Sequence, residues 1–300
     1  ACLAATGPRT CVFSVAGTIT LNGDIAVTNP FVTLAGQTAP GQGVQVRGGM
    51  LTIRTHDVII RYMKWRVGDF QSSSGTNPVL LDAINNRDIY NIMVDHSTMI
   101  WGADTGGIEI IANSHDVTVS WSIMGEGLHQ SRHPEGTGSV GHSKGVRISQ
   151  MKPQYSDKWP QRITLHHNLI TTSDDRNPLL HGVEWVDFVN NVVFNWGIDP
   201  AEGAPRKVNF INNFYIKGPQ TKSLLAIKPS TSETVPSFTP GAWYESGTAT
   251  EGFTTVRGTP SNVYTSTRHS PYSIKTEHSA QQAYDLVVAE VGANKPLRDS

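Results

Sequence analysis

The chain has 300 residues, of which 24 are Lys or Arg and 25 are Asp or Glu, giving a formal net charge of −1. A nucleic-acid-binding protein usually carries a basic excess, which is missing here, although a local basic patch is still compatible with a polyanionic ligand. No apolar run reaches the roughly 20 residues that a membrane helix needs, so we expect no membrane span. The 28 Gly and 17 Pro residues, with only 16% charged residues, favour short strands and turns over a helical bundle.

Two cysteines, Cys2 and Cys11, lie close together at the start of the chain. A disulfide between them would close a short loop, so we expect one, and with it an oxidising compartment; two free thiols are the alternative. The sequence begins without an initiator Met or a signal peptide, and we therefore expect a processed or trimmed secreted protein.

Seven short segments share the order apolar, any residue, apolar, which predicts strands with one buried face. They begin at Val32, Val58, Ile92, Val117, Ile163, Val186 and Val208. From position 58 onward the starts are 34, 25, 46, 23 and 22 residues apart. The spacing indicates a repeat of about 22–25 residues with insertions in two intervals.

This period, with several strands in each unit and no helical pattern, predicts a parallel β-helix. Leucine-rich repeats have a similar period, but their leucine pattern is absent, and a β-sandwich has strands every 8–12 residues without a longer repeat. Asn168, Asn191 and Asn213 occupy the same place in successive units. We expect them either to stack as a hydrogen-bonded ladder or simply to serve as turn residues.

The part of the chain from about residue 219 to residue 300 lacks the repeat. Within it, Ala280 to Val291 has the pattern of an amphipathic terminal helix. We expect one all-β domain over residues 1–300, with coils over about 12–218. Residues 219–300 are expected to form long loops and a helix packed along the coils.

Polar residues concentrate where the predicted strands meet long insertions, which is where a rigid scaffold commonly places binding groups. These stretches are 82–97, 101–109 and 142–178. Several of their motifs, in order and spacing, resemble those of the pectate lyases of polysaccharide lyase family one. The matching motifs are Val58-Ile59-Ile60-Arg61, Asp95-His96-Ser97, Val117-Thr118-Val119-Ser120-Trp121, His166-His167-Asn168 and Arg176-Asn177-Pro178, and Ala35 to Gly41 resembles a bacterial and fungal branch.

The resemblance covers roughly residues 7–218 and implies a right-handed parallel β-helix that is secreted and monomeric. It also implies calcium-assisted cleavage of polygalacturonate by β-elimination. That reaction removes a weakly acidic proton from C5 of a uronate, so it needs a base near C5. A cation must stabilise the charge that develops on the neighbouring carboxylate, and Ca²⁺ suits this task because it binds several oxygen ligands in flexible geometry.

The resemblance assigns roles to individual residues. Arg176 matches the catalytic base and Lys144 the lysine that pairs with the uronate carboxylate. Binding of substrate is also expected of His142, His167 and His181, the last of which stands where relatives often have a second arginine. The expected calcium ligands are Asp82, Asp104 and Glu109, although Asp104 is displaced by one residue from the usual spacing. Asp95 is expected to bond between coils rather than to bind metal.

Three other interpretations compete with this one. A β-helix polygalacturonase would need two carboxylates, which Asp174 and Asp175 offer, but its signature motifs are missing. A non-catalytic carbohydrate-binding β-helix would retain the fold without the chemistry. A transition-metal enzyme is not supported by the spacing of the histidines, which matches no zinc motif, and strand alternation predicts that His166 and His167 point to opposite faces.

Overall fold

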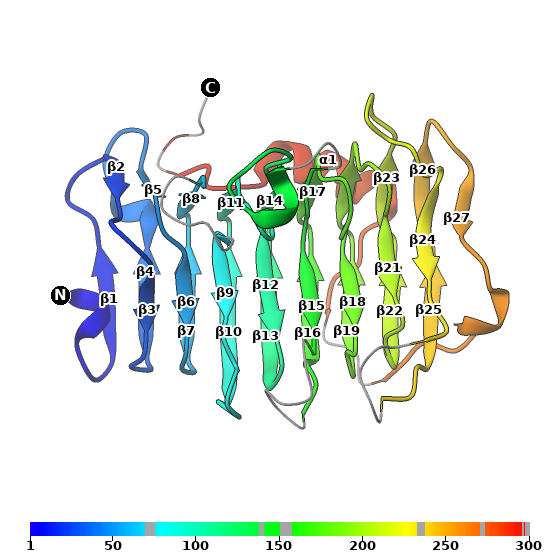
Figure 1. Ribbon diagram of the computed structural model, residues 1–300, viewed down its shortest axis with the longest axis horizontal. Coiled ribbons are helices and arrows are strands. Elements are labelled where there is room, and N and C mark those ends of the chain that lie inside the picture. Colours follow the sequence, from blue (N-terminus) through cyan, green and yellow to red (C-terminus); the bar gives the residue numbers. More distant parts are fainter. Residues whose placement is uncertain are drawn as a thin grey trace.

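The computed structural model describes residues 1–69, 76–137, 141–150, 158–232, 238–270, 274–295 and 297. In these residues the chain coils repeatedly through three parallel sheets, called A, B and C in the order in which each coil visits them. Figure 1 shows the strands stacked side by side along the long axis of the molecule. The prediction of a parallel β-helix is confirmed.

The strand bounds follow the coil order within each sheet. Sheet A contains β1 (Arg9–Val12), β4 (Val32–Ala35), β7 (Val58–Arg61), β10 (Ile89–Asp95), β13 (Ser114–Ser120), β16 (Gln161–His166), β19 (Val186–Val189), β22 (Lys207–Ile211), β25 (Ala242–Ser246) and β28 (Tyr264–Thr265). Sheet B contains β2 (Gly17–Thr20), β5 (Val44–Arg47), β8 (Lys64–Arg66), β11 (Thr98–Ile100), β14 (Ile123–Gly125), β17 (Leu169–Thr171), β20 (Val192–Phe194), β23 (Phe214–Ile216) and β26 (Ala249–Glu251). Sheet C contains β3 (Ile25–Val27), β6 (Leu51–Ile53), β9 (Val79–Leu81), β12 (Ile108–Ile111), β15 (Arg147–Ser149), β18 (Leu179–His181), β21 (Ala201–Gly203), β24 (Leu225–Pro229) and β27 (Thr255–Arg257).

The repeat found in the sequence corresponds to the register of sheet A. Its seven starting residues are paired one to the next, from Val32 to Val208, and all seven are buried. Removing each such side chain from water contributes about 1.5–3 kcal/mol, and a slip of one residue would turn it to the solvent face. The hydrophobic repeat therefore fixes how successive coils align.

The asparagine ladder is also present, at the turns between sheets A and B. Oδ1 of Asn191 accepts hydrogen bonds from the backbone N–H and the side-chain amide of Asn168 at 3.0 and 2.9 Å. Asn213 accepts from the backbone N–H of Asn191 at 2.9 Å. All three side chains are fully buried, so the ladder satisfies polar groups that water cannot reach.

The two ends of the chain are both tied to the coils. Cys2 and Cys11 form the expected disulfide. The expected terminal helix is α1 (Ala280–Glu290), which begins with a capping box between Ser279 and Gln282. Short 3-10 helices span Cys2–Ala4, Gly36–Thr38, Pro134–Thr137 and Ser261–Val263.

The stacked strands continue to Thr265, well beyond the limit of about residue 218 set by the sequence repeat. The last coil keeps the parallel pairing, with Trp243 in register with Val208, but its turn lacks the paired asparagines. Residues 266–270 and 274–295, which we call the C-terminal strap, then run back along the coils as expected, and α1 packs its Tyr284 against Phe214 of β23 (Figure 1). Among the described residues, no helix is long and apolar enough to cross a membrane.

Candidate active site

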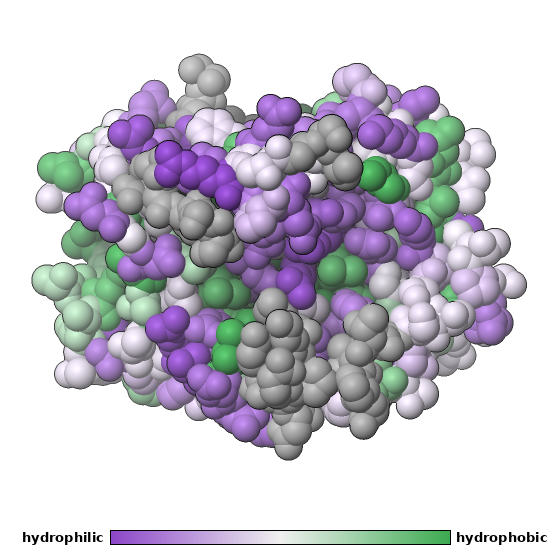
Figure 2. Space-filling view, in the orientation of Figure 1, coloured by the Kyte–Doolittle hydropathy of each residue, from purple (hydrophilic) through white to green (hydrophobic). Residues whose placement is uncertain are grey.

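The turns that lead from sheet B to sheet C vary in length and carry many charged residues. Residues 101–107, 126–146 and 172–178 form three successive turns of this kind, beside the outer face of sheet C. In Figure 2, hydrophilic surface is concentrated in the middle of the face shown, over the coils of β12, β15 and β18. Most of the residues expected to act on substrate lie in these turns or on that face.

Arg176 lies in the third of these turns and is largely buried. Its guanidinium lies 3.8 Å from a carboxylate oxygen of Asp104 and 3.7 Å from one of Asp175. The backbone of Arg176 has a φ of 62°, and its carbonyl accepts a hydrogen bond from Val146 at 2.7 Å. A Cβ at Gly145 would lie 2.4 Å from that carbonyl oxygen, so only glycine permits this approach between neighbouring coils.

The turn that carries Arg176 rests on buried polar groups. The Asn177 side chain is fully buried and donates to the carbonyls of Ser173 and Asp199 at 3.2 and 2.9 Å. The hydroxyl of Tyr215 donates to the Asn177 carbonyl at 3.0 Å. Burial raises the pKa of Tyr215, so it remains a donor across the ordinary pH range. These bonds fix the backbone from which Arg176 extends.

Lys144 lies next to Asp175 in a parallel bridge between coils, and its ammonium group pairs with the Asp175 carboxylate. The structure therefore places Lys144 and Arg176 on neighbouring turns, on either side of the Asp175 carboxylate. Asp175 contacts both of them, although the sequence suggested it only as a candidate for a hydrolase.

His142 also lies at this site, with its side chain only 2% exposed. Its Nε2 is 3.4 Å from Oδ1 of Asp104. Burial disfavours the charged form of Asp104, but the bond to His142 and the charges of Arg176 and Arg147 outweigh this and hold its pKa below the usual value. Asp104 is thus an anion that joins His142 to Arg176.

Glu109 lies on the outer face of sheet C with a cationic partner that the sequence analysis missed. Arg147, on β15, is directly opposite Glu109 of β12, and the two side chains approach to 3.1 Å. The Asn77 amide donates to the other carboxylate oxygen at 2.5 Å. Complete burial raises the pKa of Glu109, while Arg147 opposes the rise. The alternation of Val146 and Ile148 about Arg147 is the signal that places it on the outer face.

Asp82 does not join the other two expected calcium ligands. It follows β9 and pairs with Arg54 at 2.7 Å and Arg87 at 3.1 Å. In the described part of the chain, the only three metal-ligating side chains that converge are Asp104, His133 and His142. Arg54 and Arg87 hold Asp82, whereas Arg147 holds Glu109, and the sharing of one calcium ion by Asp82, Asp104 and Glu109 stays a prediction.

The two remaining histidines lie in different places. His181 is partly exposed on the outer face of sheet C, opposite Ser149, and so borders the site. His167 lies instead in the turn between sheets A and B, stacked on Trp121 with ring centroids 4.4 Å apart. The prediction that His167 belongs to the same site as Arg176 is therefore wrong.

His166 and His167 also touch each other, with their Nδ1 atoms 3.0 Å apart, rather than pointing to opposite faces. The strand ends at His166, and His167 has a φ of 54°, so alternation no longer applies. By contrast, Asp95 bonds between coils as predicted, accepting from Arg61 at 2.9 Å and from Ser120 at 2.8 Å.

Glu202 is a further titratable group that the sequence did not single out. It lies on β21, directly opposite Leu179 of β18. Leu179 follows Arg176 by three residues in the chain. Burial, together with the negative charges of Asp199 and Asp175, raises its pKa to about 8. A protonated carboxylic acid is thus present beside the turn of Arg176 at neutral pH.

Comparison with known proteins shows which enzymes this chain is related to. The probable pectate lyase C of Aspergillus flavus is 33% identical over 219 residues, covering 71% of this chain and 45% of that relative. The probable pectate lyase C of Aspergillus terreus is 28% identical over 313 residues, covering 97% of this chain and 64% of that relative. This chain is a homologue of the pectate lyases. It spans about half the length of the first of these curated relatives, and no protein-family model matches it.

Solved structures with the same fold extend this result. The pectate lyase of Bacillus sp. N165, solved in complex with trigalacturonate, has a TM-score of 0.63 at 16% identity, covering 95% of this chain and 85% of that chain. The cedar pollen allergen Jun a 1 has a TM-score of 0.65 at 15% identity, covering 95% of this chain and 80% of that chain. The fold of this pectate-lyase homologue is thus the right-handed parallel β-helix.

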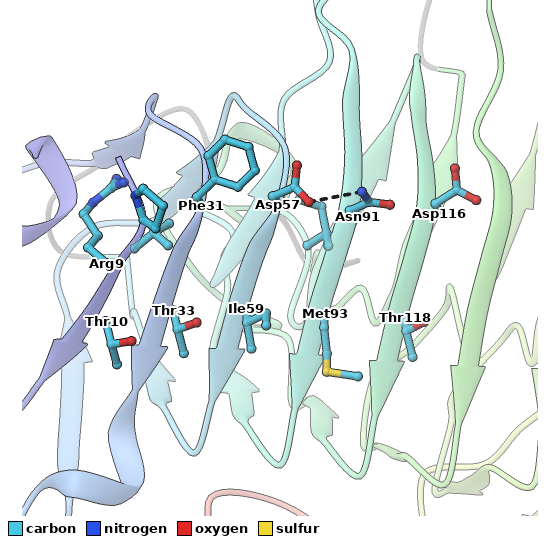
Figure 3. A pocket seen from close by; sticks show the side chains of 13 residues that line it. Arg9, Thr10, Phe31, Thr33, Asp57, Ile59, Asn91, Met93, Asp116 and Thr118 are labelled. Atoms are coloured by element: carbon cyan, nitrogen blue, oxygen red, sulfur yellow. Dashed lines mark hydrogen bonds between the residues drawn. The ribbon is translucent and has the colours of Figure 1, made fainter. Parts of the chain in front are cut away.

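The pectate-lyase homologue also has a hollow of about 830 Å³ on the outer face of sheet A. Figure 3 shows Thr33, Ile59, Met93 and Thr118 in a row across its floor. Arg9 is the only cationic side chain among the described residues that line it, and its N–H groups already donate to backbone carbonyls such as those of Asn29 and Pro30. This hollow therefore suits a polyanion less well than the site around Arg176.

Proposed function

We propose that this protein cleaves α-1,4-linked polygalacturonate by β-elimination, with Arg176 as the base. The curated relatives are named as pectate lyases, and one structural neighbour was solved with trigalacturonate. The observation that carries the proposal is the gathering of Arg176, Lys144 and Arg147 beside the outer face of sheet C. An anionic polymer lying across the coils would meet these three cations in neighbouring coils.

The reaction requires the removal of one proton, the loss of one bond and the protonation of the leaving oxygen. Arg176, with its guanidine uncharged, takes the proton from C5 of the uronate. The electron pair of the C5–H bond forms the double bond between C4 and C5, and the bond between C4 and the glycosidic oxygen breaks. The leaving oxygen then takes up a proton. Arginine is normally protonated, so the reaction is expected to accelerate as the pH rises.

Positive charge at the uronate carboxylate would lower the barrier, because the negative charge there grows as the C5 proton leaves. In the free protein, Lys144 is paired with Asp175 and Arg147 with Glu109. We propose that a uronate carboxylate draws on both cations. A calcium ion held by carboxylates such as Asp104 and Glu109 would add positive charge at the same place.

We further propose that the protein acts outside the cell, as a monomer, on pectic polysaccharide. The disulfide between Cys2 and Cys11 supports an oxidising compartment. The row of turns beside sheet C runs over several successive coils, which supports a polymeric substrate over a small molecule.

One assay tests the activity directly. The protein is incubated with polygalacturonate at alkaline pH, and the absorbance of the unsaturated uronide product is followed with added Ca²⁺ or with a chelator. We expect absorbance to grow with added Ca²⁺ and to be lost with the chelator; equal rates in both would show that the metal is not required. New reducing ends without absorbance would indicate a hydrolase, and binding without cleavage a carbohydrate-binding module.

The role of Arg176 has its own test. Arg176→Lys is expected to lower kcat by about 10²–10⁴-fold, because a positioned base contributes about that much to the rate. Arg162→Ala is the matched control, since Arg162 pairs with Asp116 on sheet A, away from this site. Full activity of Arg176→Lys, in protein with an unchanged melting temperature, would rule out Arg176 as the base.

A further inference from the structure

Three metal-ligating side chains come together in the turns from sheet B to sheet C. One ligand atom from each of Asp104, His133 and His142 lies within 4.8 Å of the other two. Asp104 belongs to the turn of residues 101–107, whereas both histidines belong to the long turn of residues 126–146. Neighbouring coils therefore build the cluster jointly, and the sequence spacing of its members gives no hint of it.

We propose that Asp104, His133 and His142 form a binding site for a divalent transition metal of the zinc class. Two imidazoles and one carboxylate are ligands that suit Zn²⁺, Co²⁺ or Ni²⁺, whereas Ca²⁺ and Mg²⁺ prefer all-oxygen sites. Three protein ligands also leave one position of a tetrahedral ion for water or another ligand.

The geometry within the cluster is close to what a bound ion needs. Ligands that bind zinc at about 2.0–2.1 Å in a tetrahedron lie roughly 3.4 Å from each other. Nε2 of His142 and Oδ1 of Asp104 are already 3.4 Å apart. The rings of His133 and His142 are stacked, with centroids 4.0 Å apart, so a small movement of His133 completes the site.

His142 provides a second and independent indication. Its side chain is 98% buried, because only 2% of it is exposed, yet Nδ1 makes no well-formed hydrogen bond within the described residues. The carboxylate of Glu135 lies 2.8 Å from that atom. A metal-ligating histidine commonly has a carboxylate at its other ring nitrogen, which fixes the ring and its tautomer.

The protonation states of the ligands agree with metal binding. The pKa of Asp104 is held below its usual value, so it is an anion at neutral pH. Burial and the neighbouring His142 lower the pKa of His133, which keeps it neutral. Its Nδ1 now accepts a bond from the Glu135 N–H at 3.2 Å, and metal binding at Nε2 would move the ring proton to Nδ1 and release that single bond.

Binding can be measured without any substrate, so the result is independent of the lyase activity. The full chain is stripped of metal by dialysis against a chelator and titrated with ZnCl₂ in a calorimeter. We expect one Zn²⁺ per chain and a rise in Tm, because a ligand that binds only the folded state stabilises it. CoCl₂ should give the visible absorption bands of a tetrahedral site, and excess CaCl₂ should not displace the ion.

Three variants test the site: one removes a ligand, one is a control and one removes an outer partner. His133→Ala should abolish binding of one equivalent, whereas His129→Ala, a change to an exposed histidine of the same turn, should leave the affinity unchanged. Glu135→Gln should weaken binding by about 10–100-fold, as loss of an outer-shell partner does. Equal metal-free melting temperatures would show that the variants are folded. Lack of binding by the unaltered chain, or binding that survives in His133→Ala, would overturn the proposal.

Discussion

From β7 onward, the turns from sheet A to sheet B are all two residues long, whereas the turns from sheet B to sheet C range from residues 252–254 to residues 126–146. The short turns are filled by stacked or bonded side chains, such as His96 on Trp121 and the ladder through Asn191. The long turns carry Asp104, Lys144 and Arg176. Two edges of one coil thus separate the residues that hold the stack together from those that present chemistry.

This difference suggests a rule for the coil: turns of uniform length hold the stack together, whereas turns of variable length carry the side chains that bind or react. A two-residue turn leaves no freedom to aim a side chain, because each turn must match those above and below it. A longer turn is free to vary, since the strands on either side already fix its ends. Changes at the A–B turns should therefore affect stability, and changes at the B–C turns should affect activity or binding.

The largest expected effect on stability is at the ladder. Asn191→Ala should lower the free energy of unfolding by about 3 kcal/mol, because it leaves buried partners such as the Asn168 N–H without a hydrogen bond. Chemical denaturation measures this. Asn262→Ala, at an exposed position, is the control and should change stability by less than about 0.5 kcal/mol. If Asn191→Ala lost activity without losing stability, the separation of the two edges would fail.

The matching change at a B–C turn should affect activity alone. Lys144→Met is expected to lower kcat/KM on polygalacturonate by about 10–100-fold, equivalent to roughly 1.4–2.7 kcal/mol of transition-state stabilisation. Its ion pair with Asp175 is partly exposed, so thermal unfolding should change little. A large drop in melting temperature with unaltered kinetics would instead make Lys144 a structural residue.

A smaller effect should appear in acid at the A–B turns. Burial lowers the pKa of His166 to about 4 and that of His167 to about 3. Both are neutral when folded but take up protons near pH 6.5 when unfolded, so their contribution is present above pH 6.5 and is lost as the pH falls toward those values. Between pH 7 and pH 5 we expect stability to fall by about 1–2 kcal/mol for His167.

Denaturation curves of the unaltered chain and of His167→Gln at these two pH values measure that loss. The variant should lose less stability on acidification, even if it is less stable at pH 7. Equal losses in both proteins would show that His167 is not responsible for the acid sensitivity.

The smallest expected effect concerns Glu202, beside the site. Its pKa of about 8 lies above the usual value near 4.5, so it contributes stability below pH 4.5 that is lost as the pH rises through about 8. Glu202→Gln mimics the protonated acid and should be more stable than the unaltered chain by about 1 kcal/mol at pH 9, after allowance for its partial exposure. The two should be equally stable at pH 4; a Gln variant that is no more stable at pH 9 would contradict the raised pKa.

The sequence predicts the features of the regular coils well and those of the long B–C turns poorly. The register of sheet A, the ladder and the inter-coil bonds of Asp95 were predictable because each depends on a short pattern repeated from coil to coil. The partner of Glu109 was not, since Arg147 enters from the next coil after a 21-residue turn, residues 126–146. The cluster of His133 with His142 and Asp104 was hidden for the same reason. Long turns of unequal length erase the relation between distance in sequence and distance in space.

The C-terminal strap alters how such a stack should come apart. In a repeat protein each coil contacts only its neighbours, so the ends can peel away one coil at a time. Here the strap bonds to Asn209 and Asn190, then to Trp121 and Thr98, the last through a hydrogen bond that joins residues 195 positions apart. Because the strap joins coils that do not touch each other, those coils should open together. Unfolding of this chain should thus be a single cooperative event rather than a gradual unzipping from its ends.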